Sequence, residues 1–362
     1  MSAEGAWVIV QVFAGIFGLL FGSFMNVCVA RMPEDRSVVW PGSACPSCGT
    51  PIKGYDNVPV LAWFWLMGKC RACKAPISAL YPLVEASFGV LTVLLFRHVV
   101  RDIAWLDLPH LAAVAWYGWL CFSILAMTLI DLRHKIIPDE FSIYSVPVGV
   151  GGAALLGRLG FTEAPTWQQS VVGALVGGGL LAAVIGGYWL WRREEGMGWG
   201  DVKLLAMFGA FLGALPALPV IVLVASVAGS AVGLTVILAR AASVELWFSM
   251  ARAAAVGAGV GLLAVYGGTW LFVEGLGALG LGATEELLGA LFGPISGAFP
   301  GAHTVFPLGL GMGAVVGSLA ALFRNVSLRM AVPFGPFLGL GALVWIFFGG
   351  NIALRWTPWA GI

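Results

Sequence analysis

Charged residues are scarce in this 362-residue chain: Asp, Glu, Lys and Arg make up 10% of it, against about a quarter of a typical soluble domain. Hydrophobic residues make up 60%, and the mean hydropathy is +0.94. This composition excludes an ordinary soluble protein. The formal net charge of +1, with no basic cluster beyond the flanks of apolar runs, disfavours a nucleic-acid partner. We therefore expect a polytopic membrane protein whose partner is the lipid bilayer.

Long apolar runs recur along the sequence. Runs of roughly 20 residues, enough to cross a hydrocarbon core ~30 Å thick, predict membrane spans. They lie at 7–30, 80–100, 109–130, 141–159, 169–191, 203–215, 218–239, 253–273, 304–323 and 332–350. None of these runs shows the alternation of polar and apolar residues that is typical of a strand. Helices are therefore predicted, because a helix satisfies its own backbone polar groups within lipid. The first run lacks a preceding basic residue and a following cleavage site, and we expect a retained span.

Basic residues collect in alternate connections between these runs. The segment 31–79 and the junctions near 133, 192, 240 and 324 hold most of the Lys and Arg residues. Threading ten spans alternately places all of these segments on one side, which the positive-inside rule identifies as the cytoplasm. Both termini are then expected to face outward.

The segment 31–79 is the one connection long enough to form a domain. It carries two C-x-x-C pairs, Cys45 with Cys48 and Cys70 with Cys73, and the 21 residues between them (49 to 69) approach the spacing of four-cysteine zinc sites. Structural zinc would supply folding energy that so small a loop cannot draw from its own core. Two disulfides or a redox pair are the alternatives. A reducing cytoplasm disfavours the first, and the lack of a βαβ pattern disfavours the second.

Two acids lie at the ends of apolar runs. Asp131 follows nine uncharged residues (122 to 130), and Asp201 lies in the stretch GMGWGDVKLL at 196–205. A charge at membrane depth costs at least ~2.5 kcal/mol, so an ionisable residue there suggests a function. The predicted topology places both acids at the same depth on the cytoplasmic side, although 70 residues separate them.

Paired carboxylates suit the hydrolysis of an amide. Two carboxylates within a few ångströms cannot both ionise comfortably, so one keeps a proton while the other acts as a base toward water. In the same interpretation Gly196, Gly198 and Gly200 let the backbone pass close to a substrate chain.

Other interpretations of these acids stay open. Asp201 is also placed to complement a helix dipole, and Asp131 to pair with Arg133 or Lys135. Asp139, after the stretch IIP, looks like the N-cap of the fourth run. Carboxylates in membranes also relay protons or ions, although no paired broken spans in matching halves support a transporter. A third hypothesis makes the cysteine loop a docking module on an inert membrane anchor.

Four stretches in sequence order carry a family resemblance. They are FGSFMNVCVARMP at 21–33, the cysteine loop continuing into YDNVP and YPLVE, IDLRHKIIPD at 130–139, and GMGWGDVKLL at 196–205 with a later PFGPFLGLGA at 333–342. Together they resemble the bifunctional prepilin peptidases, the membrane aspartic proteases of type IV pilus and type II secretion systems. The G-x-G-D signature alone is short. The combination of this signature with the four cysteines and the second Asp, in this order along the chain, is very specific to the family.

The resemblance implies that Asp131 and Asp201 form the catalytic pair of an aspartic endopeptidase. Supporting positions in the same motifs are Gly198, Gly200, Lys203, Pro138 and Asp139. The substrates would be prepilins or pseudopilins, cut at the cytoplasmic face between a short basic leader and a hydrophobic helix that stays in the membrane.

The resemblance also implies a second activity, N-methylation of the new N-terminus with S-adenosylmethionine as methyl donor. This activity is associated with the cysteine loop and its flanks, where Gly68, Lys69 and Glu85 are the candidate residues for the cofactor. No glycine-rich Rossmann fingerprint indicates such a site independently.

The sequence departs from the family pattern in two places. Leu80 stands before the Tyr-Pro of YPLVE where family members often have Arg, and the segment 241–330 looks inserted before the last span. His303, within the insertion, is expected to be an interfacial residue.

The predicted fold is thus an all-α polytopic membrane protein with about eight core transmembrane helices, about two inserted ones and a small cytoplasmic zinc-binding loop. We expect a first transmembrane helix at 1–30, the loop at 31–79, the peptidase core at 80–240, a membrane hairpin at 241–330, and the last helix and C-terminus at 331–362. The expected location is the bacterial inner membrane, with the active site facing the cytoplasm.

Overall fold

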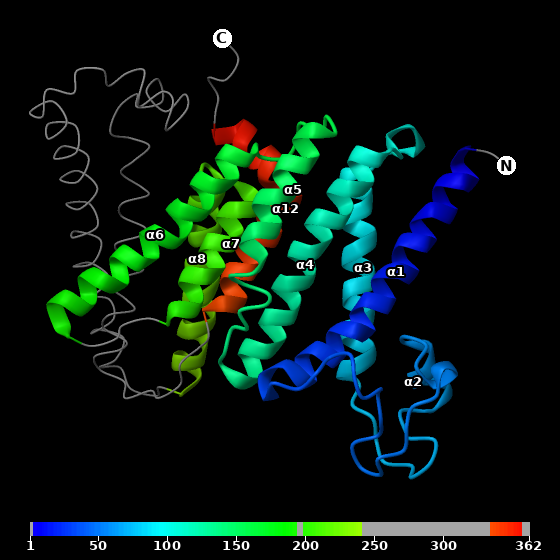
Figure 1. The fold of residues 1–362 in the computed structure, drawn as a ribbon. Coiled ribbons are helices and arrows are strands. Elements are labelled where there is room, and N and C mark those ends of the chain that lie inside the picture. Colours follow the sequence, from blue (N-terminus) through cyan, green and yellow to red (C-terminus); the bar gives the residue numbers. More distant parts are fainter. Residues whose placement is uncertain (1–2, 194–197, 241–333, 357–362) are drawn as a thin grey trace, which may run out of the picture. The chain divides into compact units, whose positions relative to one another are not determined.

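A computed structural model describes residues 3–193, 198–240 and 334–356 (Figure 1). Helices dominate the described part of the chain, and the only bridges found there are two isolated ones in the cysteine loop. The spans expected at 253–273 and 304–323, together with His303 and Gly196, lie outside the described residues. The α-helices are α1 (Ala3–Arg31), α2 (Leu61–Trp65), α3 (Leu80–Val99), α4 (Leu108–His134), α5 (Ser145–Arg158), α6 (Trp167–Arg192), α7 (Trp199–Leu212), α8 (Ala217–Arg240) and α12 (Gly335–Trp356).

Five of the described helices are long and apolar enough to cross a membrane, namely α1, α3, α4, α6 and part of α8 (Ala217–Thr235). The expected spans at 141–159 and 203–215 correspond to the shorter helices α5 and α7, of 14 residues each. At 1.5 Å per residue such helices reach only ~21 Å. The described part of the chain is therefore an all-helical polytopic membrane protein, as the composition predicted.

The expectation that Asp139 caps the fourth span is wrong. The helix α5 begins later, at Ser145, and Tyr144 occupies its N-cap position. The backbone carbonyl of Asp139 instead accepts hydrogen bonds from the N–H groups of Ser142 and Tyr144, at 3.3 and 3.0 Å. This turn leaves the Asp139 carboxylate available for a contact with another helix.

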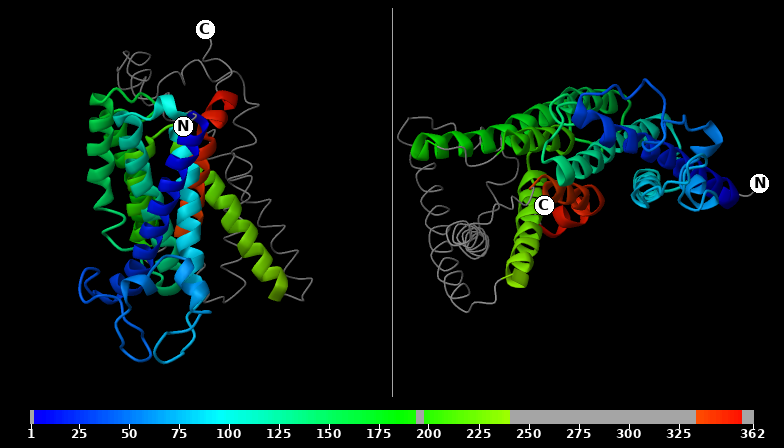
Figure 2. Two further views of the ribbon diagram at one scale, coloured as in Figure 1. Left: turned by 90° about the vertical axis from the view of Figure 1, so that its right-hand side faces the viewer. Right: turned by 90° about the horizontal axis from the view of Figure 1, so that it is seen from below.

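Small residues bring pairs of helices into close contact. The helices α1 and α3 lie side by side (Figure 2). A Cβ atom at Gly18 would come within 2.9 Å of the Gly89 Cα atom, and one at Gly22 within 2.7 Å of the Glu85 Cα atom. The helices α6 and α7 meet in the same manner where Gly173 faces the Gly209 backbone. Close backbone approach at small residues is the usual way in which membrane helices associate.

The helix α5 contacts both α4 and α7. Its residue Gly152 leaves space for the Trp116 ring of α4, and Gly149 leaves space for Phe211 of α7. The Trp116 indole donates a hydrogen bond to the Val148 carbonyl at 3.1 Å and stacks on Phe211, with ring centroids 4.8 Å apart. An aromatic contact thus joins α4 and α7 in their halves remote from Asp131 and Asp201.

The chain divides into two compact units, residues 1–218 and 219–362. In the second unit Gly341 of α12 packs on the backbone of Ile221 in α8, where a Cβ atom would come within 2.5 Å of the carbonyl oxygen. All residues of the candidate sites below belong to the first unit. In that unit the cysteine loop, the end of α4 and the start of α7 lie at one end of the helices (Figure 1).

Candidate active site and metal centre

Asp131 lies in the last turn of α4 and is only 6% exposed. Its backbone carbonyl accepts a hydrogen bond from the N–H of Lys135, which ends the helix in the left-handed conformation with φ of 55°. Asp131 takes part in none of the ion pairs found among the described residues. The alternative in which Arg133 or Lys135 neutralises it therefore has no support in the described structure.

Asp201 lies in the first turn of α7 and is half-buried. Gly198 occupies the N-cap position, and its carbonyl accepts a hydrogen bond from the Asp201 N–H at 3.3 Å. A negative charge in a first helical turn is stabilised by the helix dipole. This placement is consistent with the dipole interpretation of Asp201 and does not exclude a catalytic one.

The fold brings the two acids together. One is near the last residue of α4 and the other near the first residue of α7, at the same end of the first unit. The Asp131 and Asp201 carboxylates are close enough for their negative charges to repel each other. The two acids, 70 residues apart in sequence, therefore lie at the same end of the first unit.

Two further contacts join α7 to the segment that follows α4. A Cβ atom at Gly200 would come within 2.8 Å of the Ile137 Cδ1 atom, so a larger residue here would require the Ile137 side chain to shift. The Lys203 ammonium forms an ion pair with the Asp139 carboxylate. Each contact lies within a few residues of one of the two candidate catalytic acids.

Ile137 was not among the residues expected at the site. The glycines around Asp201 were expected to let a substrate chain pass, whereas in the structure Gly200 packs on Ile137. At Gly198 an added Cβ atom would meet only the Gly200 nitrogen, at 4.0 Å. The apolar pair in HKIIPD, placed directly before Pro138, was the available signal that this segment packs on another element.

The four loop cysteines form one cluster. All four Sγ atoms lie within 4.8 Å of one another, and those of Cys45 and Cys73 are 3.9 Å apart. A tetrahedral zinc ion with Zn–S bonds of ~2.3 Å requires S–S separations of ~3.8 Å. All four thiols are free, so no disulfide joins the loop cysteines in the structure. The residues therefore fit a single four-thiolate zinc ion.

The two cysteine pairs sit on equivalent backbone turns. The N–H of Cys45 donates to the Thr50 carbonyl at 3.0 Å, and that of Cys70 donates to the Ala75 carbonyl at 2.8 Å. Isolated bridges join residues 44 and 51 in the first turn and residues 69 and 76 in the second. Hydrogen bonds with Thr50 lower the pKa of the Cys48 thiol to about 6, whereas the hydrogen bond with Cys48 helps to raise the pKa of the Cys73 thiol to about 11. A lowered pKa favours the thiolate, which is the form that binds metal.

The three candidate residues for the methyl donor lie around α2 and α3. Glu85 of α3 is buried, and its Oε2 atom accepts a hydrogen bond from the Val60 N–H at 2.7 Å. Gly68 follows α2 with φ of 65°, and its carbonyl accepts a hydrogen bond from the Ile77 N–H at 2.7 Å. Lys69 is exposed. Glu85 and Gly68 thus fix the two ends of α2.

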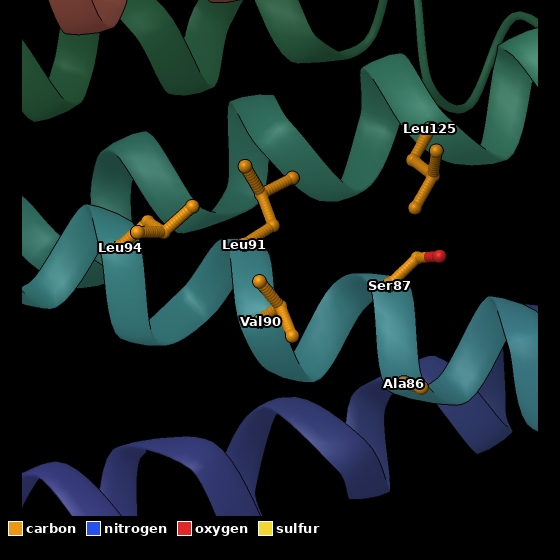
Figure 3. Close-up of a pocket in the computed structure, with 6 residues that line it drawn as sticks. All are labelled: Ala86, Ser87, Val90, Leu91, Leu94 and Leu125. Carbon is orange, nitrogen blue, oxygen red and sulfur yellow. The ribbon is translucent and has the colours of Figure 1, made fainter.

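An open groove of about 490 Å³ lies between α3 and α4, and neither acid is among its lining residues (Figure 3). Its lining is aliphatic apart from one hydroxyl, and consists of Ala86, Ser87, Val90, Leu91, Leu94 and Leu125. It contains no acid, base or metal-binding group, so it offers no hydrolytic chemistry.

The fold and these sites define a class: a polytopic helical membrane protein with two interacting carboxylates and a four-cysteine loop at one end. Family comparisons are consistent with that class. Residues 16–99 match the bacterial peptidase A24 N-terminal domain, and residues 118–234 match the type IV leader peptidase family. The first match contains the cysteine loop, and the second contains Asp131 and Asp201.

Curated relatives agree with these matches. A prepilin leader peptidase/N-methyltransferase of Aeromonas hydrophila is 37% identical over 253 residues, covering 62% of this chain and 80% of the relative. Proteins of the same description from Burkholderia pseudomallei and Myxococcus xanthus are each 38% identical, over 250 and 232 residues. These alignments cover 61% and 63% of this chain, and 75% and 63% of the relatives. No solved structure matches the chain. The chain belongs to the prepilin leader peptidase/N-methyltransferase family, peptidase family A24.

Proposed function

We propose that this protein removes the leader peptide of type IV prepilins or pseudopilins, with Asp131 and Asp201 as its catalytic pair. The observation that carries this proposal is the placement of the two acids near the end of α4 and the start of α7, at one end of the first unit. Membership of the family supports the reaction class and the substrate class. The basic residues at the same end of the helices support a cytoplasmic location for the reaction.

The proposed chemistry needs one carboxylate in each protonation state. The ionised carboxylate takes a proton from a water molecule as the water attacks the carbonyl carbon of the scissile peptide bond. The protonated carboxylic acid donates a hydrogen bond, and then its proton, to the carbonyl oxygen. As the tetrahedral intermediate collapses, the carboxyl that took the proton from water donates it to the leaving nitrogen, and the other carboxylate takes a proton back from one hydroxyl of the intermediate. The products are the carboxyl end of the leader and the amine of the mature N-terminus, and the pair returns to its starting protonation. The positions of Asp131 and Asp201 at helix ends would let a peptide bond at the membrane surface reach them.

The contacts around the pair have a positioning role in this proposal. Gly200 lets the start of α7 pack on Ile137, and Lys203 is bound to Asp139. Pro138 lies between these two contacts on the segment that follows Asp131. Of the two glycines here that the structure describes, Gly198 has only the Gly200 nitrogen near its added Cβ position among the described residues, and we assign to it the accommodation of the substrate chain.

We further propose that the cysteine loop serves the second family activity, N-methylation with S-adenosylmethionine. Zinc bound by Cys45, Cys48, Cys70 and Cys73 would hold the loop in its folded form. Glu85 and Gly68 would act by fixing α2, and Lys69 is the exposed candidate for direct contact with the cofactor.

The finer topology is also a proposal. Eight core spans, two added spans within 241–330 and the predicted domain borders would place the cysteine loop and both acids on the cytoplasmic face of a bacterial inner membrane. The positions of these elements at one end of the first unit support this arrangement.

The test uses the purified full-length protein in detergent with a prepilin and S-adenosylmethionine. We would determine the mass and N-terminus of the product for the wild type, Asp131→Asn and Asp201→Asn, with Glu140→Gln as an exposed acidic control on the segment after Asp139. We expect a leaderless, singly methylated product from the wild type and the control, and no cleavage by either Asp variant. Cleavage by both Asp variants would disprove the proposed pair.

A further inference from the structure

The cysteine loop contains an uncharged, aromatic-rich run. The twelve residues 57–68, NVPVLAWFWLMG, lie between Asp56 and Lys69 and include α2. An apolar run of about 10–14 residues is too short to span a bilayer and is typical of a buried core helix or an interfacial segment. The burial of the individual side chains distinguishes these two cases.

The large side chains of this run are mostly exposed. Leu61, Phe64, Trp65 and Met67, here called the α2 patch, are 58%, 63%, 48% and 79% exposed. A buried core helix is therefore excluded. Four large apolar side chains exposed within seven residues form a contiguous surface of the kind that marks a protein or membrane contact.

The opposite side of α2 packs on the loop itself. Ala62 is 7% exposed, and the Trp63 indole donates a hydrogen bond to the Ile77 carbonyl at 3.0 Å. Gly68 leaves room for the same indole, because its added Cβ atom would come within 3.0 Å of the ring. The loop thus holds α2 in one orientation, with the α2 patch on the side that does not pack on the loop.

A buried contact fixes the depth of α2 relative to the membrane helices. The N–H of Val60, directly before α2, donates to the Glu85 carboxylate in α3. Glu85 lies five residues, or ~7.5 Å, beyond the first residue of α3. Since α3 is a candidate membrane span, the start of α2 is level with the first turns of that span. In Figure 1, α2 lies at about the level of the lower end of α3, above the lowest part of the loop.

The charge of the loop matches a lipid surface. Residues 31–79 contain six Lys or Arg and three Asp or Glu, a formal charge of +3. Lys69 follows the α2 patch directly and is exposed. Basic residues near a membrane surface are attracted to anionic headgroups by ~1 kcal/mol each, and aromatic side chains concentrate at the level of the headgroups.

We propose that the α2 patch is inserted into the headgroup region of the adjacent leaflet, so that an anionic phospholipid bilayer is the partner of this surface. The loop is then not suspended in the cytoplasm. It is held at the membrane by the hydrogen bond from Val60 to Glu85 and by the side chains of the α2 patch. The inference is independent of the proposed peptidase activity, because no step of it involves Asp131 or Asp201.

The test is photo-crosslinking of the full-length protein in nanodiscs that contain phosphatidylglycerol. The photoreactive residue p-benzoylphenylalanine replaces Phe64, or Trp65 in a second variant that gives an independent measurement. The control replaces Ile52, an exposed apolar residue (40%) of the same loop beside the first cysteine pair. The zinc content of each variant, compared with that of the wild type, checks that the loop is folded. The readout is intact-protein mass after irradiation.

We expect lipid adducts at positions 64 and 65 in at least fivefold excess over position 52. Replacing phosphatidylglycerol with a neutral lipid should lower the adduct yield. Equal lipid adducts at all three positions would overturn the proposal. Adducts at 64 and 65 with a second protein chain in place of lipid would also overturn it, and would identify the α2 patch as a protein-binding surface.

Discussion

The carboxylate site and the cysteine cluster are built in contrasting ways. Asp131 and Asp201 come from two helices separated by 70 residues, and the packing of α4, α5 and α7 brings them together. The four cysteines come from two local turns of similar backbone geometry, 25 residues apart in the same loop. The first site therefore depends on the membrane fold as a whole. The second depends on a short segment and on the metal that it is expected to bind.

The two sites also have separate connections. The described hydrogen bonds of residues 32–79 to the helices reach α1 and α3, through contacts such as Val60 to Glu85. Among the described residues, no hydrogen bond joins residues 32–79 to α4 or α7. Perturbing one site should therefore leave the other largely intact, and four experiments probe this difference.

The largest effect is expected from Gly200→Val. The added side chain clashes with the Ile137 side chain, and we expect the start of α7 to shift relative to Asp131 to relieve part of the clash. A displacement of about 1 Å at a catalytic group lowers the rate by about 100-fold. We expect prepilin cleavage and thermal stability both to fall in Gly200→Val, with partial recovery of both in the double variant with Ile137→Ala.

Gly198→Val is the matched control for this substitution. Gly198 has φ of −72° and ψ of 140°, which any residue adopts, and open space beside it. The melting temperature of Gly198→Val should equal that of the wild type. Its KM for prepilin should rise if the substrate chain passes beside Gly198. Recovery of Gly198→Val by Ile137→Ala would contradict the separate roles given to the two glycines.

Removal of zinc should affect the loop far more than the peptidase site. After chelation we expect loss of amide protection in residues 43–52 and 68–77, measured by hydrogen exchange, because unpaired thiolates cannot hold the two turns together. Methylation should be lost with the loop structure. Prepilin cleavage should change by less than about threefold, since each site has its own structural support. A parallel loss of cleavage and protection would show that the sites are coupled.

Lys203→Gln should reduce cleavage by about three- to tenfold, because a half-exposed ion pair contributes modestly to position. The reduction should appear in kcat, with the loop's amide protection unchanged. The exchanged pair Lys203→Asp with Asp139→Lys restores the ion pair in reverse and should recover most of the activity. Failure of the exchange, with a folded protein, would indicate that Lys203 acts on the substrate or the catalytic acids directly.

The smallest effect is expected from Asp56→Asn. Arg71 donates hydrogen bonds to both Asp56 oxygens, at 2.5 to 3.0 Å, and these bonds hold the pKa of that carboxyl below its usual value. The pair braces the turn that contains Cys70. At pH 7 we expect zinc affinity to fall by about twofold, as measured by competition with a chelator.

The depressed pKa of Asp56 sets the direction of the pH dependence. Its contribution to loop stability is present above the usual carboxyl pKa and is lost as the pH falls through the lower value in the folded loop. Asp56→Asn should therefore differ from the wild type least at acid pH. Glu34→Gln, which removes an ion pair with Arg36 outside the cysteine turns, is the control and should leave zinc affinity unchanged.

Local patterns in the sequence predicted local features well. The spacing of Cys45, Cys48, Cys70 and Cys73 predicted one metal cluster, because each C-x-x-C pair fixes its own turn. Apolar run lengths predicted the helices α1, α3, α4 and α6 to within a few residues of both ends. Counting the spans predicted that Asp131 and Asp201 lie at the same end of the helices. It does not predict the distance between the two carboxylates.

Features that depend on packing between helices were not predictable in this way. Nothing in the sequence distinguishes Gly200, which packs on Ile137, from Gly198, which has open space. The late start of α5 depends on the turn at Asp139 and on its ion pair with Lys203, a contact between segments 64 residues apart. In a chain that is apolar on all sides, periodicity does not show which faces meet.

The stacking of Trp116 on Phe211 has a mechanical consequence for the spacing of the two acids. Trp116 lies 15 residues before Asp131 on α4, a lever arm of ~22 Å along the helix axis. Over that length, a tilt of α4 by about 5° about this contact moves Asp131 by about 2 Å. The angle at which α4 packs at this remote aromatic contact therefore contributes to the separation of two carboxylates at the opposite end of the helices.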